Sequence, residues 1–213
     1  SSADEIITSS QGFSDWLKER GLDSTPIENR PLNAKKPGFP SNRGIGYFGK
    51  IRDCASFKLL FDAVELIPED DRPRIIIAGD GTKVESVKKL AEKYSSHQIE
   101  FTGRFDHTEL PSLMSKINLM FAMYSPKRGN IGDGALPSKM FEAAAYGRPS
   151  IVNANTPMGE LCEAENLGAS VQWNDAQELA DAIMKLEGKV TDLEIDEKRE
   201  KKRFFETIAK IRI

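Results

Sequence analysis

The sequence predicts an α/β fold in which a parallel sheet is covered by helices on both faces. From about residue 44, short apolar runs typical of strands alternate with stretches whose apolar residues recur at helical spacing. Strands separated by helices need crossover connections, and such connections join parallel neighbours. Because these crossovers are right-handed, the domain is expected to be Rossmann-like.

Each element follows from its own pattern. The run Arg74 to Ala78 contains three successive isoleucines and ends at a glycine, as a buried strand does. The next clearest pattern places Phe57, Leu60 and Val64 on one face of a helix. In chain order we expect strands at 45–48, 74–78, 99–102, 118–122, 150–153 and 170–173. The expected helices lie at 56–66, 83–94, 107–114, 136–146, 156–163 and 176–186.

The expected domain, residues 44–190, is flanked on both sides. Residues 1–31 hold a strand-like piece at 5–8 and a helix at 11–20, and the Pro-, Asn-, Lys- and Gly-rich stretch that follows makes 32–43 a linker. Residues 191–213 contain an expected helix of mixed charge at 197–212, with apolar Phe204 and Phe205.

Composition excludes several classes of protein. The chain has 213 residues, of which 39% are hydrophobic and 30% charged, as in ordinary globular domains. A formal net charge of −3 argues against nucleic-acid binding, and no apolar run is long enough to span a membrane. Two distant cysteines favour a reducing compartment, so a cytoplasmic location is expected. The start at Ser1, without Met, suggests a piece of a longer chain.

Loops after the strands are the expected binding region. In an open parallel sheet, ligands bind outside the carboxyl ends of the strands. The loops in question are 49–53, 79–82, 103–105 and 124–135, and the last is long for this fold, which is typical of a functional loop.

A short helix with a polar start is the most informative stretch. Pro137 suits a first helical turn, and Ser138, Lys139 and Glu142 fall on one side near that start. The free N–H groups and partial positive charge of a helix start suit a phosphate. A carboxylate one turn deeper accepts hydroxyl groups of a sugar. The combination indicates a nucleotide-sugar site.

Four short motifs lie in these loops and at this helix. They are Gly-Tyr-Phe-Gly-Lys-Ile-Arg at 46–52, Ile-Ala-Gly-Asp-Gly at 77–81, Phe-Thr-Gly-Arg at 101–104, and Leu-Pro-Ser-Lys-Met-Phe-Glu at 136–142 followed by Gly-Arg-Pro. Their order resembles the C-terminal, donor-binding domain of GT-B glycosyltransferases, most of all the retaining group called family 4 or group 1. Residues 3–10 also resemble the last strand of the N-terminal acceptor domain, most of which this chain lacks.

The resemblance implies a set of site residues. The donor diphosphate would lie between a basic loop after the first strand and the helix start, the ribose would bind a glutamate, and the nucleobase would pack at a third loop. The implied diphosphate-binding residues are Gly49, Lys50, Arg52, Pro137, Ser138 and Lys139; the ribose-binding residue is Glu142; the nucleobase-binding residues are Gly103, Arg104 and Phe105.

The chain departs from the family pattern at two positions. A second basic residue would fall near Ala55, and the first glutamate of the Glu-x7-Glu motif would fall at Gly134, beside Asp133. The Leu-Pro-Ser-Lys variant resembles a subgroup that often lacks this first acid.

The implied activity is transfer of a sugar from a nucleoside-diphosphate sugar to an acceptor hydroxyl, with retention, in surface polysaccharide or lipopolysaccharide synthesis. The partners would be the donor and, through the missing domain, a sugar or lipid-linked acceptor; that acceptor would bring the protein to the inner face of a membrane. We expect no cofactor and no metal, since there is no Asp-x-Asp motif and neither His97 nor His107 has a ligand set. The fragment alone is expected to be inactive, and no catalytic residue is assigned.

Three alternatives stay open. One is a GT-B sugar-nucleotide epimerase, for which no acid and base are assigned. Another is a non-catalytic nucleotide- or protein-binding Rossmann module, which the loss of the acid at Gly134 favours. The third is a kinase, because Gly79-Asp80-Gly81 resembles a loop of NAD and lipid kinases; Ala78 replaces the first glycine of that loop, and a plain strand-to-helix turn is the simpler explanation.

Overall fold

The computed structural model describes residues 5–31, 36–40, 43–94, 98–193 and 197–210. Its centre is a six-stranded parallel sheet with the strand order β5-β4-β3-β6-β7-β8. The order reverses direction between β3 and β6, as in doubly wound folds. This confirms the expected α/β class. The strands are β3 (Gly44–Phe48), β4 (Arg74–Ala78), β5 (Ile99–Gly103), β6 (Leu119–Phe121), β7 (Ser150–Asn153) and β8 (Gly168–Val171).

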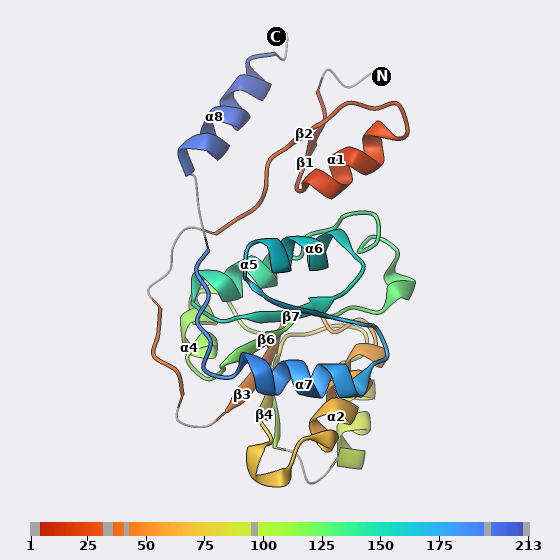
Figure 1. The fold of residues 1–213 in the computed structure, drawn as a ribbon, viewed down its shortest axis with the longest axis vertical. Coiled ribbons are helices and arrows are strands. Elements are labelled where there is room, and N and C mark those ends of the chain that lie inside the picture. The colour runs from red at the N-terminus through yellow and green to blue at the C-terminus, as the bar shows by residue number, and fades with distance from the viewer. Residues whose placement is uncertain (1–4, 32–35, 41–42, 95–97, 194–196, 211–213) are drawn as a thin grey trace.

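Helices cover both faces of this sheet. In β4, Ile75 and Ile77 belong to one buried cluster and Ile76 to the other, because successive strand residues point to opposite faces. Figure 1 shows α2 and α7 on one side of the sheet and α5 and α6 on the other. The first layer consists of α2 (Ala55–Leu66), α3 (Val84–Ala91) and α7 (Ala176–Leu186), and the second of α4 (Leu110–Met114), α5 (Ser138–Ala145) and α6 (Pro157–Ala164).

Several predicted boundaries were wrong by a few residues. The helix expected at 83–94 continues after Ala91 as a 3-10 turn, η2 (Glu92–Tyr94), and that expected at 107–114 begins as η3 (His107–Glu109). The strand expected at 170–173 lies at Gly168–Val171. A side chain on Gly168 would meet Ser150 O at 1.8 Å, so this glycine lies close against β7. Because glycine adds nothing to an apolar pattern, the sequence did not indicate that the strand begins there. Two more 3-10 turns are η1 (Glu69–Asp71) and η4 (Pro126–Arg128).

The N-terminal residues form a separate small unit. It comprises β1 (Ile7–Thr8), α1 (Gln11–Lys18) and β2 (Thr25–Pro26), and its two strands pair in parallel. Strand β2 was not predicted, because it is only two residues long and includes Pro26, a residue that disfavours a strand. The ladder bonds are donated by Thr25 N to Ile6 O and by Ile27 N to Thr8 O, so the missing N–H of Pro26 costs nothing.

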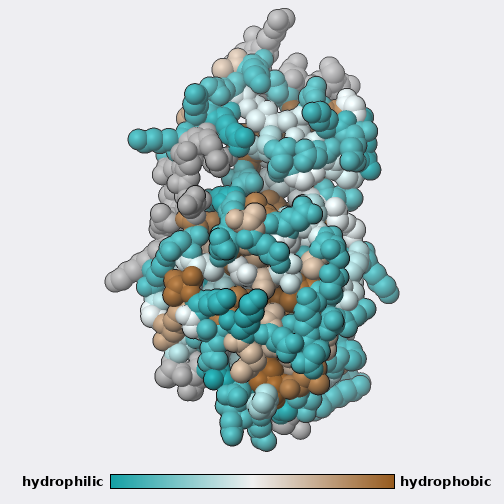
Figure 2. Space-filling view, viewed as in Figure 1, coloured by the Kyte–Doolittle hydropathy of each residue, from teal (hydrophilic) through white to brown (hydrophobic). Residues whose placement is uncertain are grey.

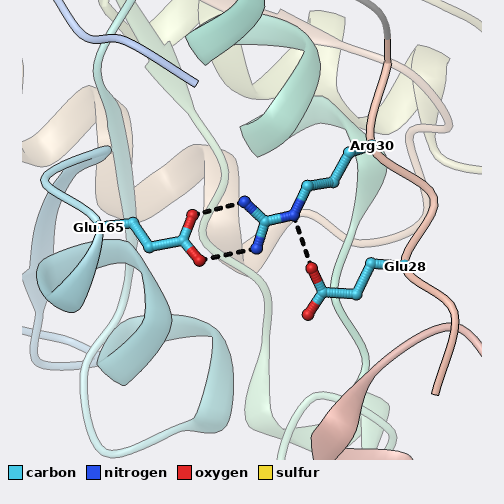
Figure 3. A network of polar contacts seen from close by, with 3 residues as sticks. All are labelled: Glu28, Arg30 and Glu165. Carbon is cyan, nitrogen blue, oxygen red and sulfur yellow. Dashed lines mark hydrogen bonds and ion pairs between the residues drawn. The ribbon is translucent and has the colours of Figure 1, made fainter. Parts of the chain in front are cut away.

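A buried arginine joins this unit to the domain. Arg30 donates two hydrogen bonds to the carboxylate of Glu165, of 2.6 and 2.7 Å, and its Nε lies 2.6 Å from Glu28. Figure 3 shows the guanidinium between the two carboxylates. Its carbon also lies 4.7 Å from the ring centroid of Phe141 in α5. The arginine side chain is only 9% exposed, so the segment around Arg30 is held firmly against α5 and α6.

The described part of the expected linker, residues 36–40, also packs on the domain. Arg148, which is 2% exposed, donates hydrogen bonds to Pro37 O at 3.1 Å and Gly38 O at 2.7 Å. Its guanidinium carbon lies 4.3 Å from the centroid of the Phe39 ring. This stretch is therefore bound along the domain surface.

The last helix, α8 (Glu197–Ile208), ends before the predicted limit, and residues 211–212 of that prediction lie outside the described part. Figure 1 shows it apart from the sheet. Phe204 and Phe205 are 42% and 65% exposed. Elsewhere the face in Figure 2 is mainly hydrophilic, with apolar residues in small separate patches. Among the described helices, none is long and apolar enough to cross a bilayer.

Candidate functional site

A cleft of about 390 Å³ lies where the strand order reverses, beyond the carboxyl ends of β3 and β6. Both strands end at the same edge of the sheet, so the loops that follow them meet there. Its lining residues come from the β3–α2 loop, the segment after β5, the β6–α5 loop and the first turn of α5. They are Tyr47, Phe48, Gly49, Lys50, Arg52, Phe105, His107, Tyr124, Arg128, Pro137, Ser138, Lys139 and Glu142.

The β3–α2 loop forms one side of the cleft and is held by the loop after β4. Gly49 N donates to Ala78 O and Ile51 N to Asp80 O, both at 2.8 Å. A side chain on Gly79 would meet Gly49 O at 1.9 Å, so the two loops pack backbone to backbone. The Gly-Asp-Gly motif thus has a structural explanation as a tight strand-to-helix turn.

Lys50 lines the cleft but is also paired. Its ammonium group forms an ion pair with Asp80, and this contact lowers the pKa of the Asp80 carboxyl. The backbone oxygen of Lys50 accepts a hydrogen bond of 2.6 Å from the Tyr47 hydroxyl. Arg52, further along the loop, is exposed. The loop therefore presents two cations, one of which already has a carboxylate partner.

The start of α5 forms the floor beside them. The helix begins at Ser138, so the predicted first residue, Leu136, was two positions too early; Pro137 is the N-cap. No side chain caps this end, and a helix start has backbone N–H groups without partners inside the helix. An anion is the complementary ligand for such groups.

Lys139, in the same turn, is buried and unpartnered. The residue is 7% exposed, and no described residue accepts a hydrogen bond from Nζ. The nitrogen lies 3.4 Å from the ring centroid of Tyr47 and 5.2 Å from that of Tyr124. Burial, helped by the nearby Arg128 guanidinium, lowers the pKa of Lys139 to about 7. An unsatisfied buried amine facing a cleft is costly unless a ligand satisfies it.

Glu142 lies one helical turn further along α5 and is half-buried. It lines the same cleft as Lys50, so the structure brings together the cationic loop and the carboxylate that were predicted to share one site. Of the three residues expected at the nucleobase, Phe105 lines the cleft, and its ring lies 6.2 Å from that of Phe48. Gly103 and Arg104 are exposed and are not among the lining residues.

Two basic lining residues were missed or given another role by sequence reasoning. His107 was interpreted as structural, yet it lines the cleft; His97 lies outside the described residues. Arg128 was not singled out from the sequence; the unusual length of the 124–135 loop was the one feature that indicated a functional residue there. Its guanidinium carbon lies 4.8 Å from the Tyr124 ring centroid, which holds the cation at the cleft.

Gly134, where the family pattern has its first glutamate, lies in a close contact with α1. A side chain here would meet Gly12 C at 2.4 Å and Phe13 N at 2.6 Å. The carbonyl of Gly134 accepts a buried hydrogen bond of 2.6 Å from Ser10 Oγ. The N-terminal unit thus occupies the space that an acidic side chain would need.

Taken together, these features define a Rossmann-like domain with a cleft suited to an anionic ligand. The model of the family described as glycosyl transferases group 1 matches residues 29–202. The chain therefore belongs to that family and is a group 1 glycosyltransferase domain.

Individual relatives are more distant. A probable glycosyltransferase of Pseudomonas aeruginosa, WbjE, is 23% identical over 173 residues, which cover 80% of this chain and 42% of that protein. An uncharacterized glycosyltransferase of Methanocaldococcus jannaschii is 24% identical over 170 residues, 78% of this chain and 42% of its own length. The chain thus spans less than half of the curated relatives it matches. The crystal structure of Anabaena HepE in complex with UDP and glucose superposes with a TM-score of 0.73 at 17% identity, over 98% of this chain and 64% of that one.

Proposed function

We propose that this chain is the donor-binding half of a retaining glycosyltransferase. The whole enzyme transfers a sugar from a nucleoside-diphosphate sugar to an acceptor hydroxyl, in surface polysaccharide or lipopolysaccharide assembly. A sugar or lipid-linked acceptor binds through the half that this chain does not include, in the cytoplasm or at the inner face of a membrane. The fragment by itself binds donor without turnover.

One observation carries the proposal: the buried amine of Lys139 has no hydrogen-bond partner among the described residues, and this lysine lines the same cleft as the uncapped start of α5. Both features call for an anion, and the diphosphate of a sugar nucleotide supplies about two negative charges at neutral pH. Arg52 and Arg128 add positive charge to the same cleft. HepE was crystallised in complex with UDP, which supports a nucleotide ligand for a protein of this fold.

Glu142 adds a group that recognises the ribose to the groups that bind the diphosphate. A half-buried carboxylate accepts two hydrogen bonds from neighbouring hydroxyl groups, and a ribose offers such a pair. Phe105 supplies an apolar surface for the base. The cleft therefore distinguishes a ribonucleoside diphosphate from inorganic diphosphate by contacts at both ends of the nucleotide.

The cations also have a role in the reaction. When the bond between the anomeric carbon and the β-phosphate oxygen breaks, its electron pair stays on that oxygen and the diphosphate gains negative charge. The backbone N–H donors near Ser138 and the cations of Arg128 and Lys139 stabilise the diphosphate more strongly in the transition state, where it carries this added charge, than in the ground state. We propose that these residues act without a metal.

A thermal-shift panel tests the proposal. UDP, GDP, ADP and CMP are added to the chain and to Glu142→Ala, with Glu85→Ala on the exposed face of α3 as the matched control. We expect one diphosphate to raise the melting temperature of the wild type and the control, and to raise that of Glu142→Ala less. Equal shifts in all three proteins would refute the ribose role. No response to any nucleotide would favour the second candidate, a non-catalytic binding module, which the replacement of the first acid by Gly134 supports.

A further inference from the structure

The surroundings of the Lys139 amine are unusual for a charged group. Tyr47 at the end of β3 lies against it, with Tyr124 beyond the end of β6 on another side, and a side chain on Gly49 would lie 3.6 Å from Nζ. The amine is thus enclosed by two rings and a backbone loop. The rings attract an ammonium ion, whereas removal from water favours the neutral amine.

The nearby charges do not settle this balance in favour of the cation. Glu142 and Asp53 favour the protonated amine, but Asp53 is already engaged by Ser56, whose N and Oγ donate to it at 2.8 and 2.9 Å. Arg128 opposes protonation. The titratable and charged groups around the cleft are Tyr47, Lys50, Arg52 and Asp53 from β3 and its loop, His107 from η3, Tyr124 and Arg128 from the segment after β6, and Glu142 from α5.

We propose that Lys139 is uncharged in the empty cleft and takes up one proton from solvent when the diphosphate of a sugar nucleotide binds. This rests on the proposed function and adds a property to it: the cleft gains part of its positive charge only with the ligand. A dianion beside Nζ adds its negative charge to that of Glu142 and Asp53, and this offsets the cost of a buried ammonium ion. An uncharged nucleoside gives no such compensation, so Lys139 selects for the diphosphate.

The charge of Lys139 is measured directly in the empty chain. Carbon-13 NMR of the lysine Cε atoms is followed against pH, and the Lys139 signal is assigned by its loss in Lys139→Arg. We expect the midpoint of the Lys139 signal near neutrality, well below the ordinary lysine value of about 10.4. In Arg128→Gln the midpoint should rise, whereas Lys127→Gln, which changes a neighbouring cation that does not line the cleft, should leave it unchanged. An ordinary midpoint for Lys139 would overturn the proposal.

Proton uptake is then measured by calorimetry with UDP-glucose, GDP-mannose and ADP-glucose. Sugar nucleotides are chosen because each phosphate is substituted at two oxygens and lacks the second ionisation of a terminal phosphate, whose pKa is about 6; the phosphates therefore do not titrate in the pH range of the experiment. In buffers of different ionisation enthalpy, binding near pH 8 should take up close to one proton, and affinity should fall about tenfold per pH unit above about pH 7. In Lys139→Arg both effects should vanish, because a guanidinium stays charged.

The outcomes separate the two proposals. Binding without proton uptake, or with equal uptake in Lys139→Arg, overturns the coupling and leaves the donor site intact. Binding of none of the three sugar nucleotides removes the donor function and the coupling with it, while the NMR midpoint still decides whether the buried amine is neutral.

Discussion

Replacing Gly134 by alanine should loosen the contact between the N-terminal unit and the domain. Gly134 has a φ of 107°, a conformation that disfavours any side chain. The added carbon would lie 2.4 Å from Gly12 C and 2.6 Å from Phe13 N, both in α1 backbone that has no freedom to swing aside. Relief requires α1 to move away from the β6–α5 loop.

The cost has two parts. The left-handed backbone adds about 1–2 kcal/mol for a residue with a side chain. Displacement of α1 also breaks the buried bond from Ser10 Oγ to Gly134 O, which contributes about 1 kcal/mol. We expect the contact to lose about 2–3 kcal/mol in all. Gly132→Ala is the matched control, because its added carbon would meet only Gly129 O, at 3.5 Å.

Urea unfolding followed by Trp16 fluorescence in a Trp173→Phe background is the assay, since Trp16 lies in α1. The Trp16 transition of Gly134→Ala should occur at lower urea than in the parent, and Gly132→Ala should stay within about 0.5 kcal/mol of it. Coincident transitions for the parent and Gly134→Ala would show that this glycine is not needed for the contact, and the explanation for the missing acid would then fail.

Two further predictions concern buried cations. Arg30→Met leaves Glu28 and Glu165 without their shared partner and should lower the free energy of unfolding in urea by about 2–3 kcal/mol. The control Lys58→Met removes an exposed pair with Asp62 and should lower it by about 0.5 kcal/mol or less. Equal effects of the two substitutions would show that the Arg30 network is not buried in solution. Lys139→Met should stabilise the empty chain most at and below about pH 7. The pKa of Lys139 is lowered from 10.5 to about 7 on folding, so between these values the unfolded wild type binds one more proton and its free energy of unfolding rises with pH. The advantage of the methionine variant should therefore shrink by about 1.4 kcal/mol per pH unit over that window, and a constant difference would contradict it.

Much of the fold was predictable because its signals are local. The run at β4 and the pattern at α7 matched their observed bounds, since buried strands and amphipathic helices are encoded within a few neighbouring residues. Strand β2 was not predictable, because Pro26 is read as a break unless the partner strand is known. The contact between Gly12 and Gly134 was equally invisible, since neither glycine signals a contact with so distant a segment.

For the site, the chain alone determined the chemistry: a basic loop, a helix start and a carboxylate one turn deeper, each carried by adjacent residues. Tertiary structure decided which of them meet. The order β3-β6 places the loops after these two strands side by side, which brings Arg128 into the cleft beside the Lys50 loop. The segment after β5 contributes Phe105 and His107 but leaves Gly103 and Arg104 outside the lining. It also decided that Lys50 has a carboxylate partner and that the Lys139 amine has no hydrogen-bond partner among the described residues, because burial and ion pairing are properties of the packed chain.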